Sequence, residues 1–219
     1  MAKLSFSNKS IEKMYDIFSE LPFFWEIDAI TCRATENSPY RSILINNLNI
    51  HADAKVLDMA CGTGLNFNLL EKKIGSNGKI VGIDNSGKTL HIARKRIVHR
   101  KWTNINLVKS DASLFHEEHE FDASICTFAI DIIRPYKEAI DRMIELTKSK
   151  GRIGFIGFNY SQHPLLKIVN SAWKISGAFI GGVEFGRNIV GYLEKNLIKV
   201  MFKEVFGGFY YIAVFKKEE

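Results

Sequence analysis

The sequence contains few of the residues that mark secreted, membrane-spanning or multidomain proteins. Only three of its 219 residues are cysteines and only four are prolines. The cysteines form no C-x-x-C pair, which disfavours a disulfide framework or a structural zinc site and is typical of a reducing cytoplasm. The chain has neither a signal-peptide core nor the roughly 18 consecutive apolar residues that span a bilayer. We therefore expect a soluble cytoplasmic protein that can still touch the inner membrane surface.

Length and composition are those of one globular domain. Hydrophobic residues make up 46% and charged residues 25% of the chain, and no Pro-, Ser- or Gln-rich tract marks a linker. The chain is long enough for one sizeable core and short for two. We predict a main domain over residues 51–219, preceded by a helical extension over residues 1–50 that can act as a lid.

Positive charge is concentrated in one stretch. The net charge is +6, and residues 85–110 contain seven Lys or Arg and no acid. A basic patch at 88–101 can attract phosphate in nucleic acid or lipid headgroups. It can equally be the solvated face of a helix whose apolar positions, Leu90, Ala93 and Ile97, recur at helical spacing.

From residue 55 onward, short apolar runs alternate with amphipathic stretches. This alternation predicts right-handed βαβ units and a doubly wound, mostly parallel α/β sheet. The last two apolar runs are joined by Gly-Gly and predict an antiparallel hairpin. Between them and the sheet, residues 174–188 contain four glycines and predict a mobile insertion. The expected strands cover residues 55–60, 78–84, 105–111, 121–129, 151–158, 199–206 and 209–215, and the expected helices cover 66–73, 86–99 and 135–149.

The strongest motif follows the first predicted strand and runs from Asp58 to Asn66. Gly62 and Gly64 let the backbone turn tightly and approach a ligand closely, and the next helix presents free N–H groups to an anion. A dinucleotide fingerprint needs a third glycine where this chain has Phe67. Asp58 suits the ammonium group of a methionine moiety, so S-adenosylmethionine is favoured over a dinucleotide.

Two further acids end the second and third predicted strands. Asp84 can accept hydrogen bonds from ribose hydroxyls, and Asp111 can accept one from an adenine amino group. Each acid can also be a helix N-cap, where aspartate is common. Because ligands bind beyond the carboxyl ends of parallel strands, the three acids and the glycine loop are expected to share one site.

These motifs resemble those of class I S-adenosylmethionine-dependent methyltransferases. The segments that carry the resemblance are D-M-A-C-G-T-G, V-G-I-D-N-S, S-D-A and F-D-A-S-I-C-T-F, in this order and spacing. The resemblance covers residues 40–160 and the terminal hairpin, and it implies the seven-stranded Rossmann-like methyltransferase fold. Ala60 departs from the family pattern, which often has glycine there. The cofactor residues that the motifs and the resemblance imply are Asp58, Ala60, Cys61, Gly62, Thr63, Gly64, Asp84, Asn85, Asp111, Ala112, Thr127 and Phe128.

A looser resemblance points to a subgroup of that family. The chain is similar to bacterial phosphatidylethanolamine N-methyltransferases and to ubiquinone/menaquinone C-methyltransferases. This implies methyl transfer to a small molecule or phospholipid headgroup, at nitrogen. Two alternatives stay open, namely an RNA methyltransferase that uses the basic patch and a non-catalytic cofactor-binding module. The oligomeric state is not predicted.

Polar and aromatic residues near the predicted strand ends are candidates for the acceptor side. Each of them can also be a packing or capping residue. No catalytic residue is assigned, and no metal site is expected because the pair His116 and His119 lacks a third ligand. The acceptor-side candidates are Tyr15, Trp25, Tyr40, Asn159, Tyr160 and His163.

Overall fold

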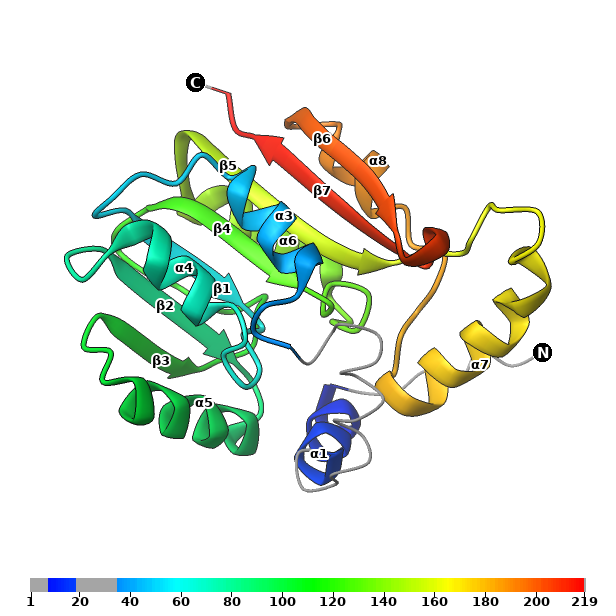
Figure 1. The fold of residues 1–219 in the computed structure, drawn as a ribbon, viewed down its shortest axis with the longest axis horizontal. Coiled ribbons are helices and arrows are strands. Elements are labelled where there is room, and N and C mark those ends of the chain that lie inside the picture. The colour runs from blue at the N-terminus through cyan, green and yellow to red at the C-terminus, as the bar shows by residue number, and fades with distance from the viewer. Residues whose placement is uncertain (1–7, 19–34, 219) are drawn as a thin grey trace.

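The computed structural model, which describes residues 8–18 and 35–218, contains one seven-stranded sheet (Figure 1). The strand order is β3-β2-β1-β4-β5-β7-β6, and the predicted seven-stranded Rossmann-like methyltransferase fold with its C-terminal hairpin is confirmed. Strands β1 to β5 are parallel, and β7 lies antiparallel between β5 and β6. The strands are β1 (Lys55–Met59), β2 (Lys79–Asp84), β3 (Ile105–Lys109), β4 (Phe121–Thr127), β5 (Thr147–Phe158), β6 (Ile198–Val205) and β7 (Tyr210–Lys216).

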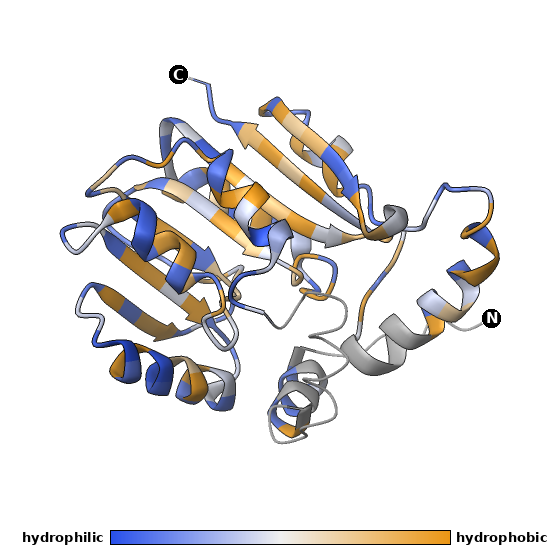
Figure 2. Ribbon diagram, in the orientation of Figure 1, coloured by the Kyte–Doolittle hydropathy of each residue, from blue (hydrophilic) through white to orange (hydrophobic). Residues whose placement is uncertain are grey.

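Helices cover both faces of the sheet, which explains why the central strands are almost continuously apolar (Figure 2). Helices α3, α4 and α5 pack on one face through residues such as Leu44, Phe67 and Ala93. Helices α6 and α8 pack on the other face through residues such as Met143 and Leu193. These helices are α3 (Pro39–Asn46), α4 (Phe67–Ile74), α5 (Gly87–Arg100), α6 (Tyr136–Leu146) and α8 (Ile189–Leu193).

Two helices lie beyond the carboxyl ends of the parallel strands instead of on a sheet face (Figure 1). They are α1 (Asn8–Phe18) and α7 (Asn170–Gly181), which follows the 3₁₀ turn η1 (Lys167–Val169). Residues 174–181 of the stretch 174–188, which was predicted as a mobile insertion, are helical and continue α7. Its glycines at 177 and 181 are tolerated within the helix although they lower helix propensity.

The start of β5 differs from the prediction, whereas the predicted turn before the last strand is present. Strand β5 begins at Thr147, before the polar residues 148–150, because Thr147 pairs with Phe121 ahead of a register shift in β4. The polar run concealed this start. The predicted Gly-Gly turn is present as the 3₁₀ turn η2 (Phe206–Gly208), in which Gly207 and Gly208 have φ of 64° and 87°.

Candidate functional site

The loop after β1 turns through three residues with left-handed backbone. Ala60, Gly62 and Gly64 have φ of 54°, 55° and 77°. Alanine in this region costs roughly 1–2 kcal/mol, so the strain at Ala60 is retained at the position where the resembling family often has glycine. A Cβ added at Gly62 would meet nothing within 4 Å, so the backbone there is open to a ligand.

The Phe67 ring occupies the space where side chains at Gly64 and Gly82 would lie. The ring is fully buried and lies against the loop and against β2. A Cβ at Gly64 would lie 2.6 Å from Cδ2 of Phe67, and one at Gly82 would lie 2.9 Å from its Cζ. The residue that breaks the dinucleotide glycine pattern therefore packs where those two glycines leave room.

Asp84 joins the glycine loop to the start of α5. Its Oδ2 accepts the backbone N–H of Gly62 at 2.8 Å, and its Oδ1 accepts the N–H of Ser86 at 2.9 Å and the hydroxyl of Thr89 at 3.2 Å. Burial raises the pKa of Asp84, although these hydrogen bonds oppose that change. The carboxylate is thus held in place by three donors at the end of β2.

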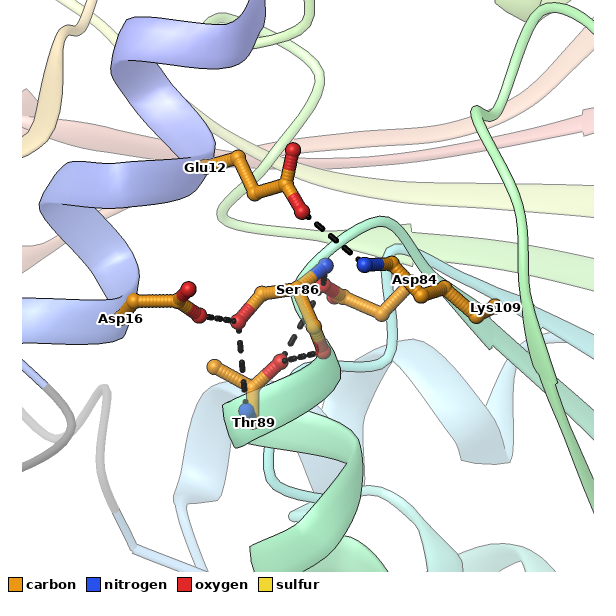
Figure 3. A network of polar contacts seen from close by, with 6 residues as sticks. All are labelled: Glu12, Asp16, Asp84, Ser86, Thr89 and Lys109. Carbon is orange, nitrogen blue, oxygen red and sulfur yellow. Dashed lines mark hydrogen bonds and ion pairs between the residues drawn. The ribbon is translucent and has the colours of Figure 1, made fainter.

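Two side chains of helix α1 point toward the same corner (Figure 3). Asp16 Oδ1 accepts the hydroxyl of Ser86, the N-cap of α5, at 2.6 Å. Glu12 Oε1 lies 3.1 Å from Nζ of Lys109 at the end of β3. Two acids of the N-terminal extension therefore meet residues beside Asp84.

A buried polar network links the glycine loop to α3 and β4. Asn66 donates from Nδ2 to both oxygens of Asp58, at 2.9 and 3.0 Å. Nη1 of Arg41 donates to Oδ1 of Asn66 at 2.6 Å and to Oγ1 of Thr127 at 2.7 Å. Burial raises the pKa of Asp58 to about 7, with Asn66 and Arg41 opposing the rise. Asp58, which is 0% exposed, holds the start of α4 through Asn66 in this structure.

Arg41 and Asn66 were not among the predicted cofactor-site residues. Asn66 stood at the end of the glycine motif and Arg41 in the predicted extension, but only the fold brings both to Asp58. A basic residue in an otherwise apolar stretch of α3 is the signal that marks Arg41 as buried and paired.

Phe128 begins an aromatic cluster beyond the ends of β4, β5 and β7. Its φ is 58°, a left-handed conformation that a bulky residue rarely adopts. Its ring lies 5.1 Å from that of Tyr210 and 6.1 Å from that of Phe158, and the Arg41 guanidinium carbon is 5.2 Å from its centroid. Trp173 of α7 extends the cluster, 5.7 Å from the ring of Tyr210.

The other predicted cofactor residues lie along the same strand ends. Asp111 Oδ1 accepts from the N–H and the hydroxyl of Ser113 in the turn after β3, where no helix follows for it to cap, and Ala112 beside it is buried. Thr63 is buried and its carbonyl accepts from Arg96. Asn85 follows Asp84 and is half-buried. Cys61 is buried, and burial raises the pKa of its thiol well above its ordinary value, which disfavours a thiolate nucleophile.

The acceptor-side residues whose side chains are described fall into two pairs. Tyr40 belongs to the aromatic cluster, with its ring 6.1 Å from that of Tyr210, and Tyr160 stacks on Phe185 at 5.1 Å. Asn159 instead donates to Glu204, and His163 is exposed on the connection to η1. The backbone of residue 15 lies in α1, but the side chain of Tyr15 and all of Trp25 lie outside the described residues.

Asp131 is a buried acid near this cluster that sequence analysis missed. Its Oδ2 accepts the N–H of Phe158 at 2.9 Å, and its carbonyl accepts the N–H of Glu184. Arg187 donates to the nearby carbonyls of Ile130 and Ile133. Burial raises the pKa of Asp131 to about 7, although the Phe158 N–H and Arg187 oppose the rise. The group anchors the connection between α7 and α8 to the ends of β4 and β5.

We expect stability to depend on pH through Asp131. Because its folded pKa of about 7 exceeds the ordinary value of 3.8, the folded state retains a proton that the unfolded chain loses between about pH 4 and 7. Stability therefore falls as pH rises across this range. Urea unfolding at pH 5 and pH 7 measures this change. Between these two pH values, the free energy of unfolding of Asp131→Asn should fall by about 2 kcal/mol less than that of the wild type.

Asp122→Asn is the matched control for this measurement. The Lys148 amine and the N–H of Lys55 hold the pKa of Asp122 below its ordinary value, against the effect of partial burial. Asp122 is therefore ionised in both states from pH 5 to 7. A wild-type pH dependence in Asp131→Asn, or a reduced one in Asp122→Asn, would contradict the assignment.

The basic patch is partly neutralised by ion pairs. Arg96 and Arg100 both pair with Glu36, and Lys109 pairs with Glu12. The Arg96 side chain also donates to the glycine loop at Thr63. The structure thus uses part of the patch to hold residues around the site, which weakens its interpretation as a nucleic-acid surface. Within 8–18 and 35–218, no three His, Cys, Asp or Glu side chains are grouped so that they could hold a metal ion.

Comparison with solved structures agrees with this architecture. The crystal structure of N-methyltransferase NodS from Bradyrhizobium japonicum WM9 with S-adenosyl-L-homocysteine has a TM-score of 0.69, at 15% identity over 95% of this chain and 99% of that one. The [4+2]-cyclase SpnF has a TM-score of 0.74, at 13% identity over 99% and 98%. These likenesses define a Rossmann-like methyltransferase fold, which the cyclase also uses.

The sequence comparisons identify the family. Residues 50–203 match the family described as Methyltransferase domain, and this chain belongs to it. Demethylmenaquinone methyltransferase of Shouchella clausii is 23% identical over 157 residues, 71% of this chain and 67% of its own length. The Lactobacillus johnsonii protein of the same name is 26% identical over 170 residues, 76% and 69% of the two lengths. The chain is a class I S-adenosylmethionine-dependent methyltransferase.

Proposed function

We propose that the corner between β1, β2 and β3 holds S-adenosylmethionine. The open backbone at Gly62, beside a carboxylate already fixed by three donors, carries this proposal. Gly62 and Gly64 would hold the methionine moiety and Asp84 the ribose. Asp111 and Ala112 would flank the adenine. The residues fit because Gly62 has no side chain where the ligand would lie and Asp84 offers an acceptor at the proposed ribose position.

We further propose that the acceptor is an amphiphile whose apolar part lies against the aromatic cluster. The cluster lies beyond the ends of β4, β5 and β7 and begins at Phe128, the residue after β4. Aromatic faces favour the positive centre that forms when an amine nitrogen is methylated, and the rings of Phe128, Phe158 and Tyr210 lie together in this cluster. This environment supports nitrogen as the accepting atom, in an amine-bearing lipid headgroup such as phosphatidylethanolamine.

Methylation at carbon is the second candidate. It is favoured by the similarity to proteins named demethylmenaquinone methyltransferase. In either case, the bound cofactor supplies an electrophilic methyl group on a sulfonium. The protein's part is to hold donor and acceptor in line and to exclude water. The network of Arg41, Asn66 and Thr127 would hold the loop beside this position, and the Phe128 ring lies next to the same network.

Methyl-label transfer tests both parts of the proposal. The full chain is first titrated with S-adenosylmethionine by calorimetry. It is then incubated with the methyl-labelled donor and one of three acceptors, namely detergent-dispersed phosphatidylethanolamine, a detergent-dispersed demethylated isoprenoid quinol, or total RNA. We expect saturable binding and label in the phosphatidylethanolamine.

Each other outcome overturns a stated part. Label in the quinol replaces nitrogen by carbon as the accepting atom. Label in RNA overturns the lipid-like acceptor and assigns a function to the basic patch. Absence of cofactor binding removes the proposed site. Binding without transfer to any of the three overturns both acceptor proposals and favours a cofactor-binding module.

A further inference from the structure

The outer side of η1 and the start of α7 expose large aliphatic side chains. Leu165 is 78% and Ile168 85% exposed, and Ile175 is 59% exposed. Ile168, Ala172 and Ile175 follow the i, i+4, i+7 spacing of one helix face. Figure 2 shows hydrophobic and hydrophilic residues alternating along this projecting segment. We call residues 165–175 the projecting surface.

The opposite side of the same helix is anchored in the protein. The Trp173 ring lies 5.1 Å from that of Phe209 and 5.7 Å from that of Tyr210, within the aromatic cluster. The helix therefore cannot roll to bury its aliphatic face without giving up these ring contacts. Its exposed face is a consequence of how Trp173 is placed.

The segment that contains the projecting surface carries only positive charges. Residues 159–183 contain Lys167 and Lys174, both exposed, and no aspartate or glutamate. Lysines flanking an apolar stripe match an anionic surface with an apolar interior, which is the interfacial region of a bilayer with acidic phospholipids. An acidic protein partner would pair with the lysines. It would also have to offer an apolar face to four exposed aliphatic side chains, those of Leu165, Ile168, Val169 and Ile175.

The position of the projecting surface also favours a bilayer as its partner. The projecting surface lies beyond the carboxyl ends of the parallel strands, on the side of the molecule where the cofactor corner and aromatic cluster lie (Figure 1). Among the described residues, no helix is both long and apolar enough to cross a membrane. Attachment through this segment would thus be at the surface, with the aromatic cluster directly behind the helix.

We propose that the projecting surface docks on anionic phospholipid bilayers and presents the acceptor cluster to the membrane. The inference rests on the proposed amphiphilic acceptor, which would then enter the cluster from the bilayer. Leu165, Ile168, Val169 and Ile175 enter the interface, and Lys167 and Lys174 lie among the headgroups.

Vesicle sedimentation of the full chain tests the docking without cofactor or acceptor. Vesicles contain phosphatidylcholine alone or with roughly a quarter phosphatidylglycerol, so neither carries the amine acceptor. We expect preferential binding to the anionic vesicles. Ile168→Ser with Ile175→Ser should lower the partition coefficient by at least about tenfold. Lys167→Glu with Lys174→Glu should abolish the preference for anionic vesicles.

Val98→Ser with Leu114→Ser is the matched control. Val98 and Leu114 are 71% and 76% exposed but lie on α5 and after β3, away from the projecting surface. This pair should bind vesicles as the wild type does. Far-UV circular dichroism and thermal unfolding of every variant confirm that it is folded.

Three outcomes would overturn the docking. They are absence of wild-type binding to anionic vesicles, equal loss in the control pair, and a dimer that dissociates in the Ile168→Ser, Ile175→Ser variant. The last would assign the surface to a second copy of the chain. These outcomes are separate from those of the proposed function, which is tested with cofactor and detergent-dispersed acceptors and without a bilayer.

Discussion

Replacing Gly64 by alanine is expected to lower the free energy of unfolding by about 3 kcal/mol. The new Cβ would lie 2.6 Å from Cδ2 of the buried Phe67 ring, and the backbone φ of 77° disfavours any side chain. Left-handed strain and overpacking each cost roughly 1–3 kcal/mol. Phe67 also lies against β2 at Gly82, so its ring has no free space to enter. Urea denaturation measures this loss.

Gly62→Ala separates steric packing from ligand binding. Gly62 has a similar φ of 55°, but its added Cβ meets nothing within 4 Å. We expect a loss of only about 1 kcal/mol in stability. Because that methyl group would project into the proposed cofactor position, affinity for S-adenosylmethionine should fall at least about tenfold in calorimetry. Equal destabilisation by the two substitutions would refute the role given to Phe67.

Asp84→Asn is expected to reduce the affinity for S-adenosylmethionine about 100-fold, or about 2.7 kcal/mol. An asparagine has one acceptor oxygen, so its amide would face either the N–H of Gly62 or the N–H of Ser86, both now bonded to carboxylate oxygens. One buried donor loses its partner, the loop moves from α5, and the charge-assisted bond to the ribose is lost. Calorimetry of the purified variant gives the affinity directly.

Asp122→Asn provides the comparison for a carboxylate of similar structural role. Asp122 accepts the N–H of Lys55 at 2.8 Å and the Lys148 amine at 2.6 Å, at the opposite ends of β1 and β4. Asp122→Asn should lower the free energy of unfolding without lowering the affinity for S-adenosylmethionine. If both variants bind S-adenosylmethionine as the wild type does, Asp84 is only a helix-capping residue and the proposed ribose position is wrong.

The fold could be derived from the order of amino acids. Apolar runs near residues 55, 80, 105 and 121, each ended by polar or small residues and separated by amphipathic stretches, admit few arrangements other than a parallel sheet between helices. The glycine loop and the position of Asp84 followed in the same way, because strand ends in such a sheet converge on one edge. Local spacing was sufficient for these features, since each depends on neighbours in sequence.

What depends on distant neighbours emerged only once the chain was folded. Arg41 reaches Thr127 across 86 positions, and Ser86 meets Asp16 across 70. Burial raises the pKa of Asp131, and the inward anchoring of Trp173 leaves Ile175 facing outward. Periodicity reports which residues prefer the interior. It does not report which buried polar groups will find each other, because that pairing depends on packing between elements far apart along the chain.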